Sequence, residues 1–216
     1  MIKVSATVCG TILRDAVVTT NEKGVSTLEL TVRVNLPSRS GDTNHIDVVA
    51  LINDSDHKHL KEYKKGARIV VDGKMNISKA DDIYVFVIRD AQPQINYTVP
   101  SEDSITGDIT FTGKAVKVAQ KTDKRGRQFL VLNGASPIKV GTNKWDSVWV
   151  NFLRFPSKNS KPEDIFPSWL KEGINVEILG DLVVSSYQNR IGLTSRIMEM
   201  MQKEDNTQSN AATAEE

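Results

Sequence analysis

Hydrophobic and polar residues alternate over long parts of the chain, with the period of two that predicts half-buried β-strands. Between Leu28 and Val34, for example, every second residue is a large aliphatic one and the residues between them are polar. A polar stretch that ends at Gly66 predicts a short helix, because glycine closes a helix in a left-handed conformation at little cost. The first half is therefore expected to hold strands over residues 2–15, 25–35, 45–52, 68–75 and 83–89, with the helix over 54–65.

The second half repeats this order of elements. The closest internal match pairs residues 60–73 with 167–180, and in both segments two glycines stand seven residues apart. Three strands, a helix and two strands are what a five-stranded Greek-key barrel of the oligonucleotide-binding (OB) type requires. We therefore predict an all-β protein of two tandem OB-fold barrels with one short helix each. In the second half the strands are expected over residues 108–119, 128–132, 145–152, 175–184 and 190–200, and the helix over 162–172 before Gly173.

Two breaks in the pattern suggest the domain boundaries. Residues 92–105 contain two prolines in a polar run, which predicts a linker there. Residues 202–216 contain no large apolar residue after Met201 and should form a flexible acidic tail. The first barrel is then residues 1–92, a degenerate copy that serves as scaffold or oligomer interface, and the second is residues 106–201, the main binder.

Composition limits the classes of function. No apolar run is long enough for a membrane span and no export signal precedes the first strand, so we expect a cytoplasmic protein that makes no membrane contact. The net charge is +1, but residues 101–203 carry 15 basic and 11 acidic groups, and residues 204–216 carry four acids. Cys9 is the only cysteine, which excludes an internal disulfide and predicts a buried thiol.

The strand over residues 145–152 carries the most informative side chains. Alternation places its three apolar residues between 148 and 152 on one side, which we expect to be core. Trp145 and Trp149 then lie on the other side, where indole rings stack on bases of any identity. The alternative is that the two rings pack between barrels or between subunits.

Three further aromatic residues in the second half allow similar predictions. Tyr187 stands near the tip of a predicted hairpin beside Arg190, where the ring either stacks on a base or only covers the hairpin. Trp169 and Phe129 are expected to be core residues.

A run of positive charge lies between residues 114 and 127, where six cations face one acid. In an OB barrel this segment adjoins the usual nucleic-acid groove, although a solvated surface turn would look the same. If three or four cations contact phosphates, the logarithm of the affinity should fall with that of the salt concentration with a slope of roughly −2 to −3. The candidate phosphate-binding residues are Lys114, Lys117, Lys121, Lys124, Arg125 and Arg127, with Arg154 as an extension.

Nothing in the sequence indicates catalysis. His57 and His59 stand beside two aspartates, but a two-residue spacing points helical side chains apart, so a polar helix face is expected rather than a metal site. No phosphate-binding glycine loop or nucleophile motif is present. We predict a protein that is not an enzyme and needs no cofactor.

Residues 106–200 contain Lys-Arg-Gly-Arg-Gln-Phe at 124–129, the tryptophan-led strand at 145–152, Leu-Lys-Glu-Gly at 170–173, and Gly-Asp-Leu at 180–182 followed by Tyr187. Through these motifs the segment has a resemblance to the bacterial single-stranded DNA-binding protein family. It implies an OB fold over which single-stranded DNA wraps, with Trp145 and Tyr187 stacking on bases. It also implies a role in replication, recombination or repair, a homodimer supplying four OB folds, and partners among replication or recombination proteins.

The sequence departs from the family in several places. Asn151 stands where the family carries a phenylalanine six residues after the tryptophan, and the first half has His45 where the second has Trp145. The tail also lacks the apolar tip that recruits partner enzymes in that family. An RNA-binding or primosome-type accessory module and a protein-interaction scaffold therefore remain open as alternatives.

Overall fold

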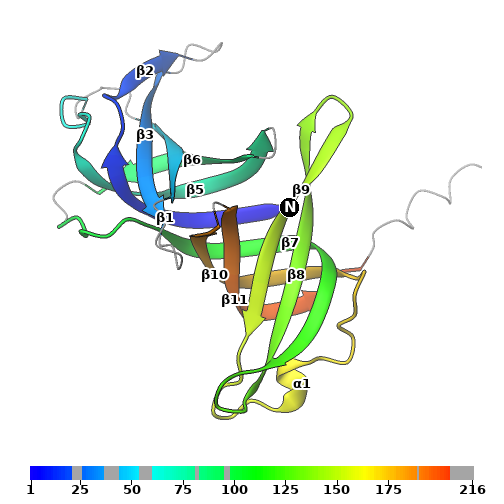
Figure 1. The fold of residues 1–216 in the computed structure, drawn as a ribbon. Helices are drawn as coiled ribbons and strands as arrows, with labels where there is room; N and C mark the ends of the chain where they lie inside the picture. The colour runs from blue at the N-terminus through cyan, green and yellow to red at the C-terminus, as the bar shows by residue number, and fades with distance from the viewer. Residues whose placement is uncertain are drawn as a thin grey trace, which may run out of the picture.

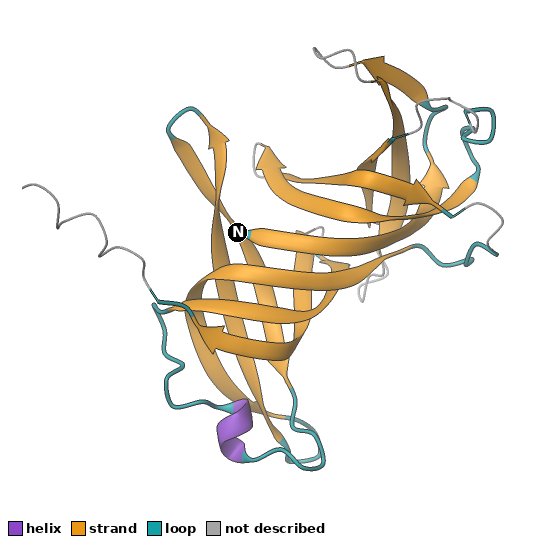
Figure 2. Cartoon of the chain, turned by 180° about the vertical axis from the view of Figure 1, so that it is seen from behind, coloured by secondary structure: helices purple, strands orange, loops and turns teal. Residues whose placement is uncertain are grey.

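The described part of the chain consists mostly of β-strands, as Figure 2 shows, and the one helix in it is one turn long. A computed structural model describes residues 1–20, 26–36, 44–53, 60–80, 83–94, 98–188 and 190–204. The elements are β1 (Ile2–Ile12), β2 (Val17–Thr20), β3 (Ser26–Leu36), β4 (Asn44–Ile52), β5 (Arg68–Ala80), β6 (Ile83–Pro93), β7 (Ser104–Thr122), β8 (Gln128–Gly141), β9 (Lys144–Arg154), α1 (Pro162–Ile165), β10 (Asn175–Tyr187) and β11 (Arg190–Gln202).

The strands follow the hydrophobic alternation in the sequence. In β4 the aliphatic residues Ile46, Val48 and Ala50 are buried, while His45 and Asp47 on either side of Ile46 are exposed. A strand with one apolar side must cover that side, and closing a sheet into a barrel covers it on all strands at once. The alternation thus specifies both the strands and the need for closure.

The strands form two closed barrels, which Figure 1 shows one above the other. In barrel 1 (β1 to β6) the closed order is β1–β5–β6–β4–β3–β1, with β2 added at the edge of β3. In barrel 2 (β7 to β11) it is β7–β8–β9–β11–β10–β7. Each barrel contains one parallel pair, β4 with β6 and β9 with β11, and its other pairs are antiparallel. This is the five-stranded Greek-key OB topology, so the predicted all-β fold with two tandem OB barrels is confirmed.

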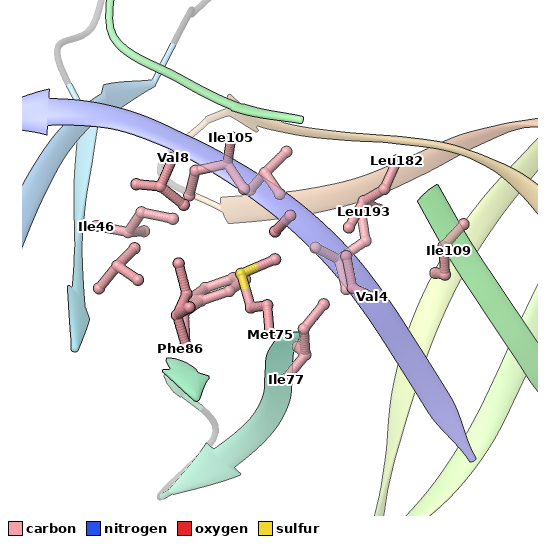
Figure 3. Packing of buried hydrophobic residues seen from close by; sticks show 14 of the residues in the cluster. Val4, Val8, Ile46, Met75, Ile77, Phe86, Ile105, Ile109, Leu182 and Leu193 are labelled. Atoms are coloured by element: carbon pink, nitrogen blue, oxygen red, sulfur yellow. The ribbon is translucent and has the colours of Figure 1, made fainter. Parts of the chain in front are cut away.

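The two barrels share a sheet and a core. β1 pairs with β7 in antiparallel register from Ile2 opposite Phe111 to Cys9 opposite Ser104. Val8 therefore lies opposite Ile105, and one continuous hydrophobic cluster includes residues of both barrels. Figure 3 shows part of it, with Val8 of barrel 1 beside Ile105 of barrel 2. The barrels are joined along a packed interface.

The predicted helices are mostly wrong. Of the helix expected over 54–65, residues 54–59 lie outside the described ones and residues 60–65 form turns. The helix expected over 162–172 is only α1, which ends before Pro167. Proline lacks the backbone N–H that a further turn would need and disfavours helical geometry in the residue before it. The expected closing glycines, Gly66 and Gly173, do take left-handed conformations with φ of 87° and 89°.

The boundaries at the linker and tail also differ from expectation. β6 continues to Pro93 and β7 begins at Ser104, so both strands extend into the segment expected to be linker. Gln202 belongs to β11 and the Lys203 N–H donates to the Asn175 carbonyl at 2.9 Å, so the start of the predicted tail is part of the barrel. The rest of that tail, residues 205–216, lies outside the described residues. Within the described part, no helix has the length and apolar character needed to cross a membrane.

Candidate nucleic-acid interface

β9 presents two indole rings on its outer side. The core-facing Val148, Val150 and Phe152 are buried, as alternation predicted. Trp145 and Trp149 point the other way and are 64% and 45% exposed. These exposures argue against burial of either ring between the two barrels of one chain.

The neighbouring strands continue the outer side of β9 in register. Asn151 lies opposite Asn133 of β8, which lies opposite Lys117 of β7, and on the far side Asn151 pairs with Thr194 of β11. Residues directly opposite one another on paired strands share a face. We call this surface the tryptophan face; it comprises Lys114, Lys117, Ala119, Lys121, Phe129, Val131, Asn133, Ala135, Lys139, Trp145, Trp149, Asn151, Leu153, Thr194 and Arg196.

Four lysines lie on the tryptophan face. Lys114, Lys117 and Lys121 lie opposite Ala135, Asn133 and Phe129, respectively, and all three are exposed. Lys139, which the sequence reasoning did not select, lies opposite Trp145. None of the four forms an ion pair with a residue that the structure describes. Their charges are therefore available to phosphates.

The turn between β7 and β8 organises its own charges around Asp123. Its carboxylate accepts the backbone N–H groups of Arg125 and Arg127 at 2.8 and 2.9 Å and forms an ion pair with the Arg127 guanidinium at 2.8 Å. The Arg127 N–H, opposed by some desolvation and helped by the Arg125 N–H, holds the pKa of Asp123 below its usual value. Arg127 is thus partly neutralised, whereas Lys124 and Arg125 are exposed.

Tyr187 lies at the tip of the β10–β11 hairpin, where it is 58% exposed and directly opposite Arg190. Along β10, Tyr187 points to the same side as Val183, which lies opposite Thr194. Thr194 belongs to the tryptophan face. The tyrosine ring and the Arg190 guanidinium are therefore placed at one border of that face.

Arg154 is not placed with the others. It lies opposite Leu130, whose side chain is in the core, and is itself half-buried. Alternation along β9 puts it on the inner side with Phe152, at the end of the barrel. Its predicted position as an extension of the lysine track is wrong.

Sequence reasoning missed a pair of stacked rings. Phe129 lies on the tryptophan face opposite Lys121, and its ring stacks on that of Phe155 with centroids 4.9 Å apart and planes 23° from parallel. The prediction that Phe129 is a core residue is therefore wrong, because Leu130 and Leu132 take the core positions of β8. The alternation of Leu130 and Leu132 along β8 was visible in the sequence and already indicated that Phe129 faces outward.

Over its described residues, barrel 1 carries no comparable surface. The outer side of β3 and β4 holds Arg33 and Asp47, which form a two-pronged ion pair at 2.9 and 3.0 Å. The Arg33 hydrogen bonds, against some desolvation, lower the pKa of Asp47. Arg14 pairs with Glu29 at 2.8 Å in the same region. Cations that are already matched by acids have little to offer a phosphate chain.

The remaining predicted positions are quickly placed. Cys9 is buried as expected, and burial is the main cause that raises the pKa of its thiol. Trp169 packs against the core, as expected. His57 and His59 lie outside the described residues, and among those described no group of His, Cys, Asp and Glu side chains could hold a metal ion.

Comparison with known proteins finds distant structural likenesses. No protein-family model matches the sequence, and no curated protein matches it. The single-stranded DNA-binding protein of Thermus aquaticus is similar over 99% of this chain and 98% of its own, with 12% identity and a TM-score of 0.48. A deletion mutant of that protein is similar at 13% identity and the same TM-score, over 95% of this chain and 96% of its own. The mitochondrial single-stranded DNA-binding protein Rim1 of S. cerevisiae covers 44% of this chain and 92% of its own at 14% identity, with a TM-score of 0.34.

Proposed function

We propose that this protein binds single-stranded DNA without regard to sequence, through the tryptophan face of barrel 2. The observation that carries the proposal is that one continuous sheet surface holds both exposed indole rings and lysines without an ion-pair partner among the described residues. Every base has a flat face and every nucleotide a phosphate, so this pair of features recognises a strand independently of its sequence.

The dimensions of the face suit an extended strand. Trp145 and Phe155 are ten residues apart on the same strand and its continuation, a distance of about 33 Å at roughly 3.3 Å per residue. Trp149 stands between them, and the asparagines at 133 and 151 supply neutral donors and acceptors beside it. At about 1–3 kcal/mol for each stacked base, a few such contacts fix a strand in the groove.

A binding protein needs no catalytic group, and we propose that this chain is neither an enzyme nor dependent on a cofactor. Its role would be to cover and protect strands exposed in replication, recombination or repair in the cytoplasm. We also propose that residues 1–92 and 106–201 form the two barrel domains and that the chain dimerises to supply four OB folds. Proteins of replication or recombination are the proposed partners.

Binding of a homopolymer strand to the parent protein and to Trp145→Ala plus Trp149→Ala tests the proposal. We expect the double variant to lose roughly 20-fold or more in affinity, since each ring contributes about 1–3 kcal/mol. Trp169→Phe is the matched control, because that ring packs against the core. The parent's tryptophan fluorescence should be quenched on titration with the strand.

Equal affinity of parent and double variant would contradict the proposal. Matched RNA and DNA strands, measured side by side, decide between the two nucleic acids, because contacts to base faces and phosphates do not in themselves exclude ribose. A clear preference for RNA would replace DNA by RNA as the ligand of the same face.

A further inference from the structure

Two hairpins of barrel 2 carry exposed aromatic residues of the proposed site, and each of them contacts barrel 1. The β8–β9 hairpin carries Trp145 and extends past the body of barrel 2 toward the end of β5 (Figure 1). The β10–β11 hairpin carries Tyr187. Hairpins that project from a barrel are among its most mobile parts, so contacts between these two hairpins and barrel 1 affect the positions of the Trp145 and Tyr187 rings.

The β8–β9 hairpin is tied to barrel 1 by an ion pair. Lys79 of β5 places its Nζ 3.4 Å from Oδ2 of Asp146, which directly follows Trp145 and points to the opposite side of the strand. Only 13% of the Lys79 side chain is exposed, and its ammonium lies 5.4 Å from the centroid of the Tyr84 ring. Ile138, opposite Asp146 in register, packs against the core beside this contact.

The environment of Asp146 favours its carboxylate form. The Ser147 backbone N–H donates to the Asp146 carboxylate at 2.6 Å. This hydrogen bond first, and then the nearby Lys79 ammonium, hold the pKa of Asp146 below its usual value, against some desolvation. A cation so little exposed is held in place by its acidic partner, because water is not there to replace that partner.

The β10–β11 hairpin has a contact of its own. Asn44, the first residue of β4, donates from its side-chain amide to Oγ of Ser186. Ser186 is buried and immediately precedes Tyr187. A buried hydroxyl that loses its partner costs free energy, so this hydrogen bond favours one position of the hairpin.

We propose that barrel 1 holds the two aromatic-bearing hairpins of barrel 2 in a binding-competent arrangement, with Lys79 and Asn44 as positioning residues. The proposal rests on the proposed function for its consequence, since ordered rings bind a strand without first losing conformational freedom. Barrel 1 then contributes to affinity although its own outer face carries no exposed tryptophan and its charges are paired with one another.

Asp146→Asn separates this proposal from simple electrostatics. Removing a negative charge beside the tryptophan face should strengthen binding of a polyanion if charge alone matters. If the ion pair positions Trp145, binding should instead weaken about three- to tenfold, and amide hydrogen exchange over residues 138–148 should quicken. Glu177→Gln is the matched control, because Glu177 pairs with Lys203 at 3.2 Å within barrel 2 and touches neither hairpin tip.

Lys79→Arg and Lys79→Met complete the test. The arginine variant keeps the cation and should retain parent exchange rates and affinity, whereas the methionine variant should behave like Asp146→Asn. Asn44→Ala should quicken exchange over residues 183–188 and leave residues 138–148 unchanged. Unaltered exchange in both hairpins, or tighter binding by Asp146→Asn, would overturn the proposal. If the parent protein bound no strand, the proposed function would fail. The exchange rates would still show whether barrel 1 holds the two hairpins in place.

Discussion

The salt dependence of binding can be derived from the four lysines of the tryptophan face, Lys114, Lys117, Lys121 and Lys139. For single strands the slope of log affinity against log salt is about −0.7 for each phosphate neutralised, so four contacts give about −2.8. Between 50 and 200 mM salt the affinity should then fall about 50-fold. Lysines without an acidic partner among the described residues are the right ones to count, because a paired cation releases fewer counterions from the strand.

The perturbation is the double variant Lys117→Gln plus Lys121→Gln. Both lysines are exposed; Lys117 lies opposite Asn133, and Lys121 lies opposite Phe129. Their loss should halve the slope to about −1.4, which leaves only about a sevenfold fall in affinity over the same salt range. Titration of a labelled homopolymer strand at four salt concentrations, followed by fluorescence anisotropy, measures both slopes.

Lys61→Gln plus Lys65→Gln is the control with the same change in net charge. These two lysines are exposed on barrel 1, away from the tryptophan face. If phosphates contact only the tryptophan face, the control should keep the parent slope. A control that lost as much slope as the test variant would show that net charge governs binding, and a test variant with the parent slope would remove these lysines from the site.

Three further outcomes are expected. Gly134→Ala should destabilise the fold by about 1–3 kcal/mol in urea unfolding, because its Cβ would lie 2.7 Å from the buried Phe111 ring, whereas Gly141→Ala, with 3.7 Å to its nearest neighbour, should be near neutral. Phe155→Ala should weaken strand binding roughly 5- to 150-fold in the anisotropy assay with no loss of melting temperature beyond a few degrees. Asp103→Asn should lower the free energy of unfolding by about 1–3 kcal/mol at neutral pH and reduce the fall of melting temperature with falling pH. If the melting temperatures of the variant and the parent fell in parallel with pH, this prediction would be refuted.

The sign of that acid effect follows from the pKa of Asp103. Burial raises it, but the hydrogen bonds from Arg68 and Asn35 outweigh burial and leave the pKa below the usual 3.8. A carboxyl with a depressed folded-state pKa binds its proton more readily when unfolded, so its stabilisation is full above about pH 4. It is lost as the pH falls through the lower, folded-state value. The carboxylate joins β3, β5 and the connection between the barrels, so the loss should loosen that junction.

The strands were predictable from sequence because alternation is a local property, and the inner and outer sides of β9 were assigned correctly from it. The register between neighbouring strands could not be predicted from the sequence, and β7 shows why. The pairing shifts between Ala115 and Lys117. Unbroken alternation from Lys114 would have turned Lys117 and Lys121 inward, whereas this bulge places both lysines on the tryptophan face. A one-residue irregularity that exchanges the two sides of a strand leaves no local signal in the sequence.

The errors at helices and at Phe129 have different causes. A polar stretch before a glycine predicted helices over residues 54–65 and 162–172, but Pro167 stops the second one after a single turn. Phe129 was assigned to the core by residue type, although its place in the alternation with Leu130 points outward. Phe155 was not considered because it lies beyond the end of β9, and only the ring contact reveals that it continues the face.

One fold in two copies shows which features are needed for the barrel and which for binding. Both barrels have the same strand order and closure, so the topology does not distinguish them. A row across the first strands of barrel 1 reads Thr11, Arg33 and Asp47, and its arginine is held by the aspartate. A row across barrel 2 reads Lys117, Asn133 and Asn151. Neutral amides leave the lysine charge available where an aspartate would bind it, so we expect strand binding to be confined to barrel 2.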